Sequence, residues 1–402
     1  MTRRRVKITG IGPVTPAGIG REEFSKRILE SVSRVRPYGG LGKNVGPLVA
    51  AHLPDFQLKD YVDLERVPNS TARQTNFAIA GTMLALQDAG IPLEEVRRYR
   101  SAVILGSSLM DFGGVLNSVD AVTRLGARAA KPRIIYTATA FSSCGAINEV
   151  LGMAAQAMNV QSACCAGLDA IGCAAQLVAS GEVELAICGG VEAPLHRTPL
   201  LELRAAGLTP PNDEMPERLD RPFDLWRTTG VVSEGAAIFV IEPERSPRRG
   251  YSYISGYAFA SDPVGDLLGG LVDSTRLALA DARRRPGDIE AISAWGPGHK
   301  AIDAAEVRAM ERVFGTALAD IPTASIKGAI GTPLGAAPAI QVAAAALAQR
   351  DSAMPPTVNW DYPDPACSLN LSNRSRLLAH KVTLINAHGL GGANSSMVLE
   401  QC

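Results

Sequence analysis

Residues 161–190 read QSACCAGLDAIGCAAQLVASGEVELAICGG, and this stretch decides the fold. Two adjacent cysteines, Cys164 and Cys165, lie where a turn meets a helix. Apolar residues follow at helical spacing over residues 168–178, and a Ser-Gly pair ends the helix. Residues 183–190 then alternate as a strand that ends in two glycines. The stretch therefore predicts a turn, a helix and a strand in succession.

The position of Cys164 favours a nucleophile. A thiol at a helix start is close to unpaired backbone N–H groups and to the positive end of the helix dipole, which favour the thiolate. The alternative is structural, because small buried cysteines also pack well at a helix start. The spacing alone leaves both interpretations open.

Length and composition bound the class of protein. The chain has 402 residues, too many for one small core, which predicts two domains or two similar halves, residues 1–245 and 246–402. It carries 40 basic and 40 acidic residues, so no overall field attracts nucleic acid or an anionic membrane. The content of 46% hydrophobic residues with 39 glycines and 5% aromatics is typical of an α/β protein.

The seven cysteines form neither a disulfide framework nor a CxxC metal pair, so we expect no bound metal and a reducing cytoplasm. The start, MTRRRVKITGIG, lacks the long apolar region of a signal peptide. No apolar run reaches the roughly 18 residues of a membrane span. We therefore expect no membrane partner.

Strand and helix patterns alternate along the chain. In the first half we expect strands at 5–10, 101–106, 159–162 and 236–241, and helices at 21–31, 71–89, 112–125 and 147–158. Residues 10–13 are predicted to be a turn, residues 32–69 irregular, and residues 191–229 a proline-rich insertion.

A second half repeats this pattern. We expect strands at 251–262, 289–295, 321–326, 381–387 and 396–401, and helices at 273–282, 303–314 and 334–349, with a turn over 388–396. In both halves a central strand leads through a glycine turn into a helix of small residues. The repeat predicts two related α/β halves with buried helices between sheets.

Several motifs in this order resemble the β-ketoacyl synthases, the condensing enzymes of fatty-acid and polyketide assembly. They are ITGIGPVTPAG at the start, SACCAG with ICGGVE, RPFD with GVVSEGAA, then DAAE, SIK, LGAAP and NAHGLGGANSSMVL. The likeness covers essentially the whole chain. It implies a thiolase-like, five-layered αβαβα sandwich of two similar halves that dimerises through strands near the motif cysteine.

The resemblance also implies site residues. Cys164 occupies the position of the cysteine that accepts the acyl chain from an acyl carrier protein. The family's two histidines, which stabilise the oxyanion during decarboxylation, are replaced by Trp295 and Thr332. Two threonines that hold the pantetheine arm are replaced by Pro297 and His299.

Other family positions are kept or altered. Lys327, Asp303 and Glu306 match the family pattern, and the gating loop contains His388 and Leu390. His299 or His388 could substitute for a missing histidine. Trp offers one N–H and Thr an uncharged hydroxyl, so ordinary decarboxylative condensation is predicted to be lost.

The closest subgroup in pattern is the chain-length factor, the β subunit of type II polyketide ketosynthases. The segments AGLDA, GAAP with MPPTVN, and GLGGANSSMVL resemble that subgroup. The glutamine usual at its nucleophile position is Cys164 here. We therefore expect a non-condensing subunit that forms a heterodimer with an active ketosynthase, or otherwise a homodimer, and shapes the acyl tunnel.

Two alternatives remain open at this stage. Cys164 could transfer an acyl group without decarboxylation, or the chain could be a stand-alone acyl-binding scaffold. In each case the resemblance implies no bound cofactor and acyl groups carried on the phosphopantetheine of an acyl carrier protein. The ring of Trp295 is expected to narrow the space beside Cys164.

Overall fold

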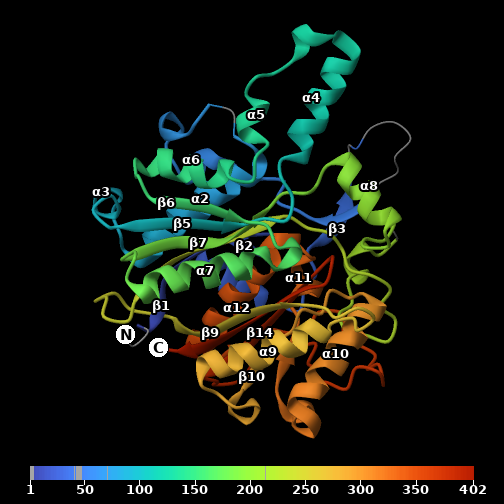
Figure 1. Ribbon diagram of the computed structural model, residues 1–402. Coiled ribbons are helices and arrows are strands. Elements are labelled where there is room, and N and C mark those ends of the chain that lie inside the picture. Colours follow the sequence, from blue (N-terminus) through green and yellow to red (C-terminus); the bar gives the residue numbers. More distant parts are fainter. Residues whose placement is uncertain (1–3, 40, 42–47, 70, 213) are drawn as a thin grey trace.

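The structure is a computed structural model that describes residues 4–39, 41, 48–69, 71–212 and 214–402. Parts of two predicted segments, residues 40 and 42–47 of the irregular stretch and residue 213 of the insertion, lie outside the described residues. Figure 1 shows layers of helices and strands, with one helical arm standing away from them.

The first half builds a five-stranded sheet in the order β1-β8-β7-β5-β6. The strands are β1 (Val6–Thr15), β5 (Ser101–Gly106), β6 (Gln156–Val160), β7 (Leu185–Glu192) and β8 (Gly235–Pro243). β6, β5 and β7 run parallel, whereas β7, β8 and β1 pair antiparallel. A short strand, β2 (Gly18–Ile19), extends β1.

The second half repeats that arrangement in the order β9-β15-β14-β10-β11. Its strands are β9 (Ser252–Ser261), β10 (Ala291–Ser293), β11 (Thr323–Ala324), β14 (Val382–Gly389) and β15 (Ala393–Gln401). β11, β10 and β14 are parallel, and β14, β15 and β9 are antiparallel. The two parts form one continuous sheet, in which β9 pairs with β1 at Lys7 and Tyr253.

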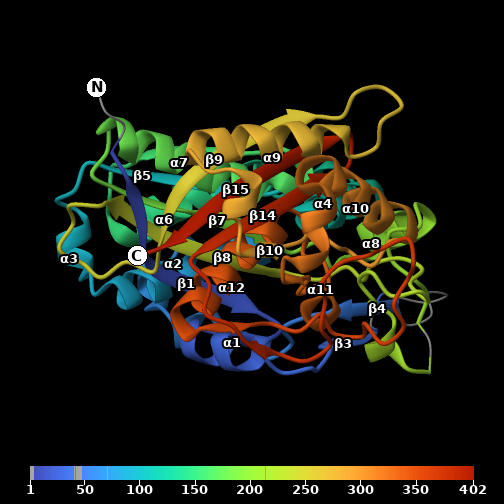
Figure 2. The ribbon, with the colours of Figure 1, turned by 90° about the horizontal axis from the view of Figure 1, so that it is seen from below.

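Helices complete the layers. α2 (Arg73–Ala89) and α6 (Ser142–Leu151) cover the outer face of the first sheet, and α9 (Gly269–Ala282) and α10 (Lys300–Phe314) cover the second (Figures 1 and 2). α7 (Ala166–Ser180) and α12 (Ala337–Asp351) pack together between the sheets. This order of layers confirms the expected αβαβα sandwich of two similar halves. The two halves are alike because the same succession of strands and helices occurs in each.

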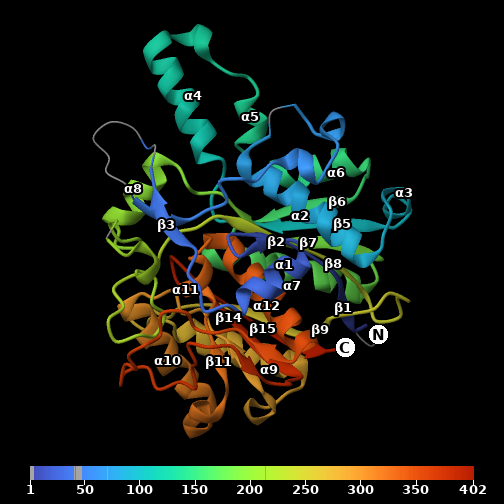
Figure 3. The same cartoon turned by 180° about the vertical axis from the view of Figure 1, so that it is seen from behind.

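The remaining helices are α1 (Arg21–Ile28), α3 (Leu93–Val96), α4 (Phe112–Leu125), α5 (Ile134–Thr137), α8 (Arg197–Ala205) and α11 (Lys327–Ile330). Two small hairpins pair β3 (Val35–Tyr38) with β4 (Leu48–Ala51) and β12 (Ala353–Met354) with β13 (Arg376–Leu377). α4 and α5 form the arm that projects from the body (Figure 3). The prediction of irregular structure over 32–69 missed β3 and β4.

The turn predicted at residues 10–13 was wrong. β1 continues through these residues with a bulge between Ile8 and Gly10. The glycines serve packing instead, since a Cβ on Gly10 or Gly12 would lie about 2 Å from a carbonyl oxygen of α2 (2.1 Å and 1.9 Å). They therefore let the helix backbone approach the strand closely.

The helix predicted over 147–158 was also wrong at its end. Gly152 adopts a left-handed conformation with φ of 62° and ends α6 after Leu151. The chain then enters β6 at Gln156, which the sequence pattern placed at residue 159. Likewise the final turn is shorter than predicted, because His388 and Gly389 belong to β14 and Ala393 begins β15.

One stretch of the described residues, Ala163–Ser180, is long and apolar enough by composition to cross a membrane, yet 67% of it is buried inside the protein. It coincides with α7 and the turn before it, in the middle layer of the sandwich. Its apolar character therefore fits a core helix that packs on both sheets.

Candidate functional site

Cys164 lies in the turn Ala163–Cys165 immediately before α7 and is 9% exposed. Ala163 takes a left-handed conformation with φ of 51°, which is costly for a residue with a Cβ. Gly389, at the end of β14, backs this turn: a Cβ there would lie 2.9 Å from the Cys164 nitrogen. Gly389 of the second half thus packs against the turn that holds Cys164 in the first half.

The surroundings of Cys164 oppose the thiolate that a helix start favours. Burial, followed by the charge of the Glu192 carboxylate, raises the pKa of the Cys164 thiol to about 12. The Leu390 backbone N–H and the Lys327 ammonium act in the opposite direction but do not overcome burial. The helix start offers its N–H groups, but the low-dielectric surroundings keep the thiol protonated at neutral pH.

Trp295 follows β10 and is 3% exposed. It belongs to the same contiguous cluster of buried apolar residues as Cys164. Its ring centroid lies 4.3 Å from Nζ of Lys327, and its carbonyl oxygen accepts a hydrogen bond of 3.0 Å from the same nitrogen. An apolar ring therefore occupies the family's histidine position inside the core.

Lys327, at the start of α11, is fully buried. Besides Trp295 it donates to Oε1 of Gln341 at 2.9 Å. Burial lowers its pKa to about 7, against the opposing charges of Glu306, Asp220 and Asp303. Lys327 thus contacts Trp295 and also interacts with the buried charges of Glu306, Asp220 and Asp303.

Asp303 and Glu306 lie one turn apart on α10 and are both buried. Glu306 accepts the backbone N–H groups of Trp295 and Gly296 at 2.7 and 2.8 Å, and Asp303 accepts that of Phe223 at 2.7 Å. Burial raises the pKa of both carboxyls, that of Asp303 to about 7. These hydrogen bonds fix the 295–296 turn and the RPFD segment.

Thr332, which the motifs predict at the position of the second histidine, lies in a tightly held loop. Its N–H donates to the Val231 carbonyl at 2.7 Å, and its carbonyl accepts from Ser233 at 3.2 Å. Among the described residues its buried Oγ1 has no hydrogen-bond partner. Pro297 is close by, since a Cβ on Gly230 would lie 2.3 Å from the Pro297 carbonyl and 3.6 Å from Thr332 Oγ1.

The two candidate histidines have structural contacts. Nδ1 of His299 accepts from the Ile302 N–H at 3.4 Å and caps α10, while burial lowers its pKa. His388 is 6% exposed on β14, and its Nδ1 lies 2.9 Å from Oδ1 of Asn394. Burial lowers the pKa of His388 as well. Both rings are therefore neutral at pH 7.

Leu390 is the exposed member of the site: the residue is 57% exposed, and its backbone N–H lowers the pKa of the Cys164 thiol. Lys327 contacts Trp295 and also acts on the pKa of Cys164. The backbone amide is the kind of donor that can stabilise a developing oxyanion at a thioester carbonyl.

Sequence reasoning missed two polar residues at this junction. Gln341 is fully buried in the alanine-rich α12 and donates to the carbonyls of Ser293, Ala294 and Asn386. Glu192 is fully buried at the end of β7. A glutamine in an alanine-rich helix, and a glutamate ending a buried strand, were the available signals.

Comparison with known proteins identifies the family of this chain. Residues 3–246 match the family "Beta-ketoacyl synthase, N-terminal domain", and residues 251–361 match "Beta-ketoacyl synthase, C-terminal domain". The chain therefore belongs to the β-ketoacyl synthase family, and the resemblance read from its motifs is confirmed.

Relatives span the full length. The chain is 30% identical to a 3-oxoacyl-(acyl-carrier-protein) synthase 2 of Coxiella burnetii, covering 100% of this chain and 99% of that protein. It is 29% identical to the tetracenomycin polyketide synthase ketoacyl synthase alpha subunit of Streptomyces glaucescens, covering 99% of this chain and 98% of that protein.

Solved structures agree with the fold. "The ishigamide ketosynthase/chain length factor" superposes with a TM-score of 0.91 at 28% identity over 100% of both chains. A chain from the structure of a type II PKS acyl-carrier protein in complex with its ketosynthase superposes with a TM-score of 0.90 at 26% identity, again over 100% of both chains.

Proposed function

We propose that this chain is a non-condensing ketosynthase-like subunit of a type II polyketide or fatty-acid-type synthase, acting as a chain-length factor. It pairs with an active ketosynthase and contributes to the wall of the acyl tunnel. The observation that carries the proposal is the loss of both histidines, with the buried Trp295 ring at one position and the loop-bound Thr332 at the other.

The chemistry of these replacements supports the proposal. Decarboxylation of a malonyl thioester needs donors aimed at the developing oxyanion, and each missing donor costs about 2.7–4 kcal/mol. Neither a tryptophan ring over Lys327 nor a threonine hydroxyl supplies a charged donor there. Acyl chains would reach the complex on the phosphopantetheine of an acyl carrier protein, with no other cofactor, in the cytoplasm.

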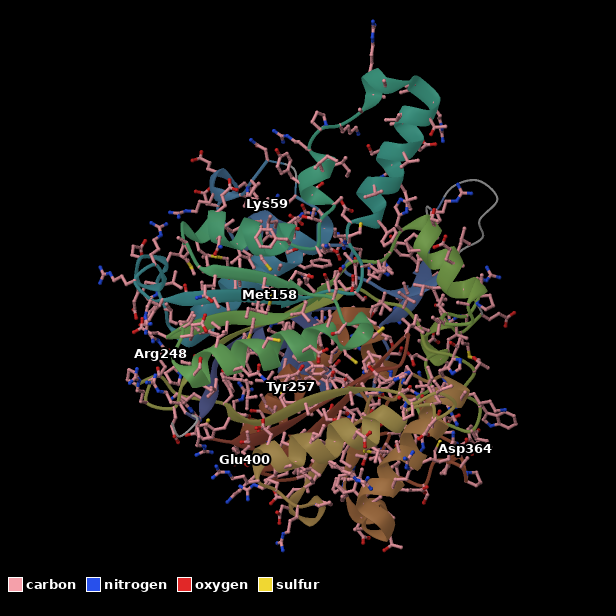
Figure 4. The ribbon with its side chains drawn as sticks, viewed as in Figure 1. Lys59, Met158, Arg248, Tyr257, Asp364 and Glu400 are labelled. Carbon is pink, nitrogen blue, oxygen red and sulfur yellow. The ribbon has the colours of Figure 1, made fainter. Side chains whose placement is uncertain are left out.

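A partner surface is also present. β6 is the edge strand of the first sheet, and Met158 on it is 45% exposed (Figure 4). The arm carries exposed apolar side chains, Val119, Leu125, Ile135 and Tyr136, and the exposed Phe141 precedes α6. An uncovered strand edge beside apolar side chains is typical of an interface. We assign this surface to the ketosynthase partner.

Co-expression tests the pairing. The chain is expressed with a histidine-containing type II ketosynthase, purified through a tag on one subunit and examined by native mass spectrometry. A stable heterodimer whose product length changes when this subunit is exchanged supports the proposal. A tight homodimer that ignores such partners, or a chain that remains alone, contradicts it.

A second candidate is acyl transfer by Cys164 without decarboxylation. It is favoured by the retained cysteine, by the backbone turn at Ala163 that presents it, and by the Leu390 N–H at the thiol. Intact-mass measurement after incubation with acyl carrier proteins bearing a range of acyl groups tests it. An adduct that disappears in Cys164→Ala supports transfer, and no adduct with any acyl group rejects it.

A further inference from the structure

Glu192 ends β7 as a fully buried carboxylate with four short hydrogen bonds. Oε2 accepts from the Ser108 N–H at 2.7 Å, from Ser108 Oγ at 2.5 Å and from the Gly335 N–H at 3.1 Å. Oε1 accepts from the Leu109 N–H at 3.1 Å. The side chain therefore links three segments that are distant in sequence.

The first of these segments is the root of the arm. Ser108 and Leu109 follow β5 and lead directly into α4. Among the described residues of α4 and α5, none is buried, so the arm has little packing of its own against the body. Its direction, seen in Figures 1 and 3, therefore depends strongly on the contacts at its root.

The second segment belongs to the other half of the chain. Gly335 lies in the turn Leu334–Ala336 that starts α12. A Cβ at Gly335 would lie 2.6 Å from the Ser108 nitrogen and 2.9 Å from Glu192 Oε2. The three segments are thus packed backbone to backbone, with the carboxylate between them.

The carboxylate also acts on Cys164. Its negative charge disfavours the thiolate, whereas the Lys327 ammonium and the Leu390 N–H favour it. The same carboxylate therefore bonds to the root of the arm and disfavours the Cys164 thiolate.

We propose that Glu192 is a positioning residue that holds the root of the arm against the start of α12. These hydrogen bonds fix the direction of the arm in the chain alone. That direction presents the apolar face of the arm to a partner subunit, and this clause rests on the proposed function.

Two substitutions separate hydrogen bonding from charge. Glu192→Gln keeps an oxygen acceptor for the three donors at Oε2 but removes the charge. Ser108→Ala removes one donor and leaves the charge. Glu242→Gln is the matched control, because Glu242 is also buried, on the neighbouring strand β8, and bonds to Thr9 and Arg248.

The experiment uses the full chain without a partner. Glu242→Gln should leave hydrogen exchange at the root of the arm unchanged.

Hydrogen exchange of peptides covering residues 107–111 tests this positioning role. Glu192→Ala should exchange at least about tenfold faster there, and Glu192→Gln should restore rates to within about threefold of wild type. If Glu192→Ala does not fold, Ser108→Ala must show faster exchange in the same peptide. Unchanged exchange in the folded variants overturns the positioning role, whereas failure of wild type to bind any ketosynthase overturns only the proposed function.

Discussion

The ammonium nitrogen of Lys327 lies 4.3 Å from the ring centroid of Trp295 and also donates to the carbonyl of the same residue. One buried side chain therefore holds both the ring and the backbone of Trp295. Cation–π contacts of a desolvated, protonated amine contribute about 2 kcal/mol. Trp295 is thus fixed inside the core.

Trp295→Ala should lower the free energy of unfolding by about 3–5 kcal/mol, because it leaves a cavity in the buried cluster. It should also accelerate alkylation of Cys164. Trp226→Ala is the control, since Trp226 is 65% exposed and should cost no more than about 0.5 kcal/mol. Urea unfolding and peptide mass spectrometry measure both effects. Unchanged labelling of Cys164 would show that the ring does not block it.

Gly230→Ala should destabilise the protein by about 1–3 kcal/mol, because the new Cβ would lie 2.3 Å from the Pro297 carbonyl oxygen. Gly287→Ala is the matched control, with no heavy atom within 4 Å of the added Cβ. Thermal and urea unfolding compare the two variants. Equal stability in both would mean that the 295–299 loop shifts without cost.

Glu192 predicts a pH dependence of stability. Burial raises the pKa of its carboxyl from 4.5 to about 7 in the folded protein. The folded state binds this proton more tightly than the unfolded state, so the contribution is complete below pH 4.5 and is lost as the pH rises through 7. Between these pH values Glu192→Gln should lose less stability than wild type, by on the order of 3 kcal/mol. Parallel urea-unfolding curves across pH would contradict this.

Met158→Glu should weaken association with a ketosynthase partner at least about tenfold, because it places a charge on the edge strand of the proposed interface. Val264→Glu is the control: Val264 is fully exposed outside the named strands and helices. Sedimentation or native mass spectrometry gives the affinities. If both variants bind like wild type, the partner covers another face.

Much of the site was readable from local patterns. The turn before α7, the helix that ends at Gly181, and the strand after it follow from apolar spacing and glycine, which act within a few residues. The substitutions at 295 and 332 were visible because ordered motifs flank them. The glycines at 10 and 12 were misread as a turn, since nothing local shows that a helix packs on them.

The sequence by itself determined the repeated α/β pattern and the family, and it predicted the roles of Cys164, Trp295 and Thr332. Only the tertiary structure decided that the thiol is neutral, that Asp303 and Glu306 hold loops, and that Glu192 links the arm to α12. The physical reason is distance along the chain. Spacing encodes the local backbone, whereas desolvation and hydrogen bonds arise from segments far apart in sequence, such as Ser108, Glu192 and Gly335, that meet only when both halves fold.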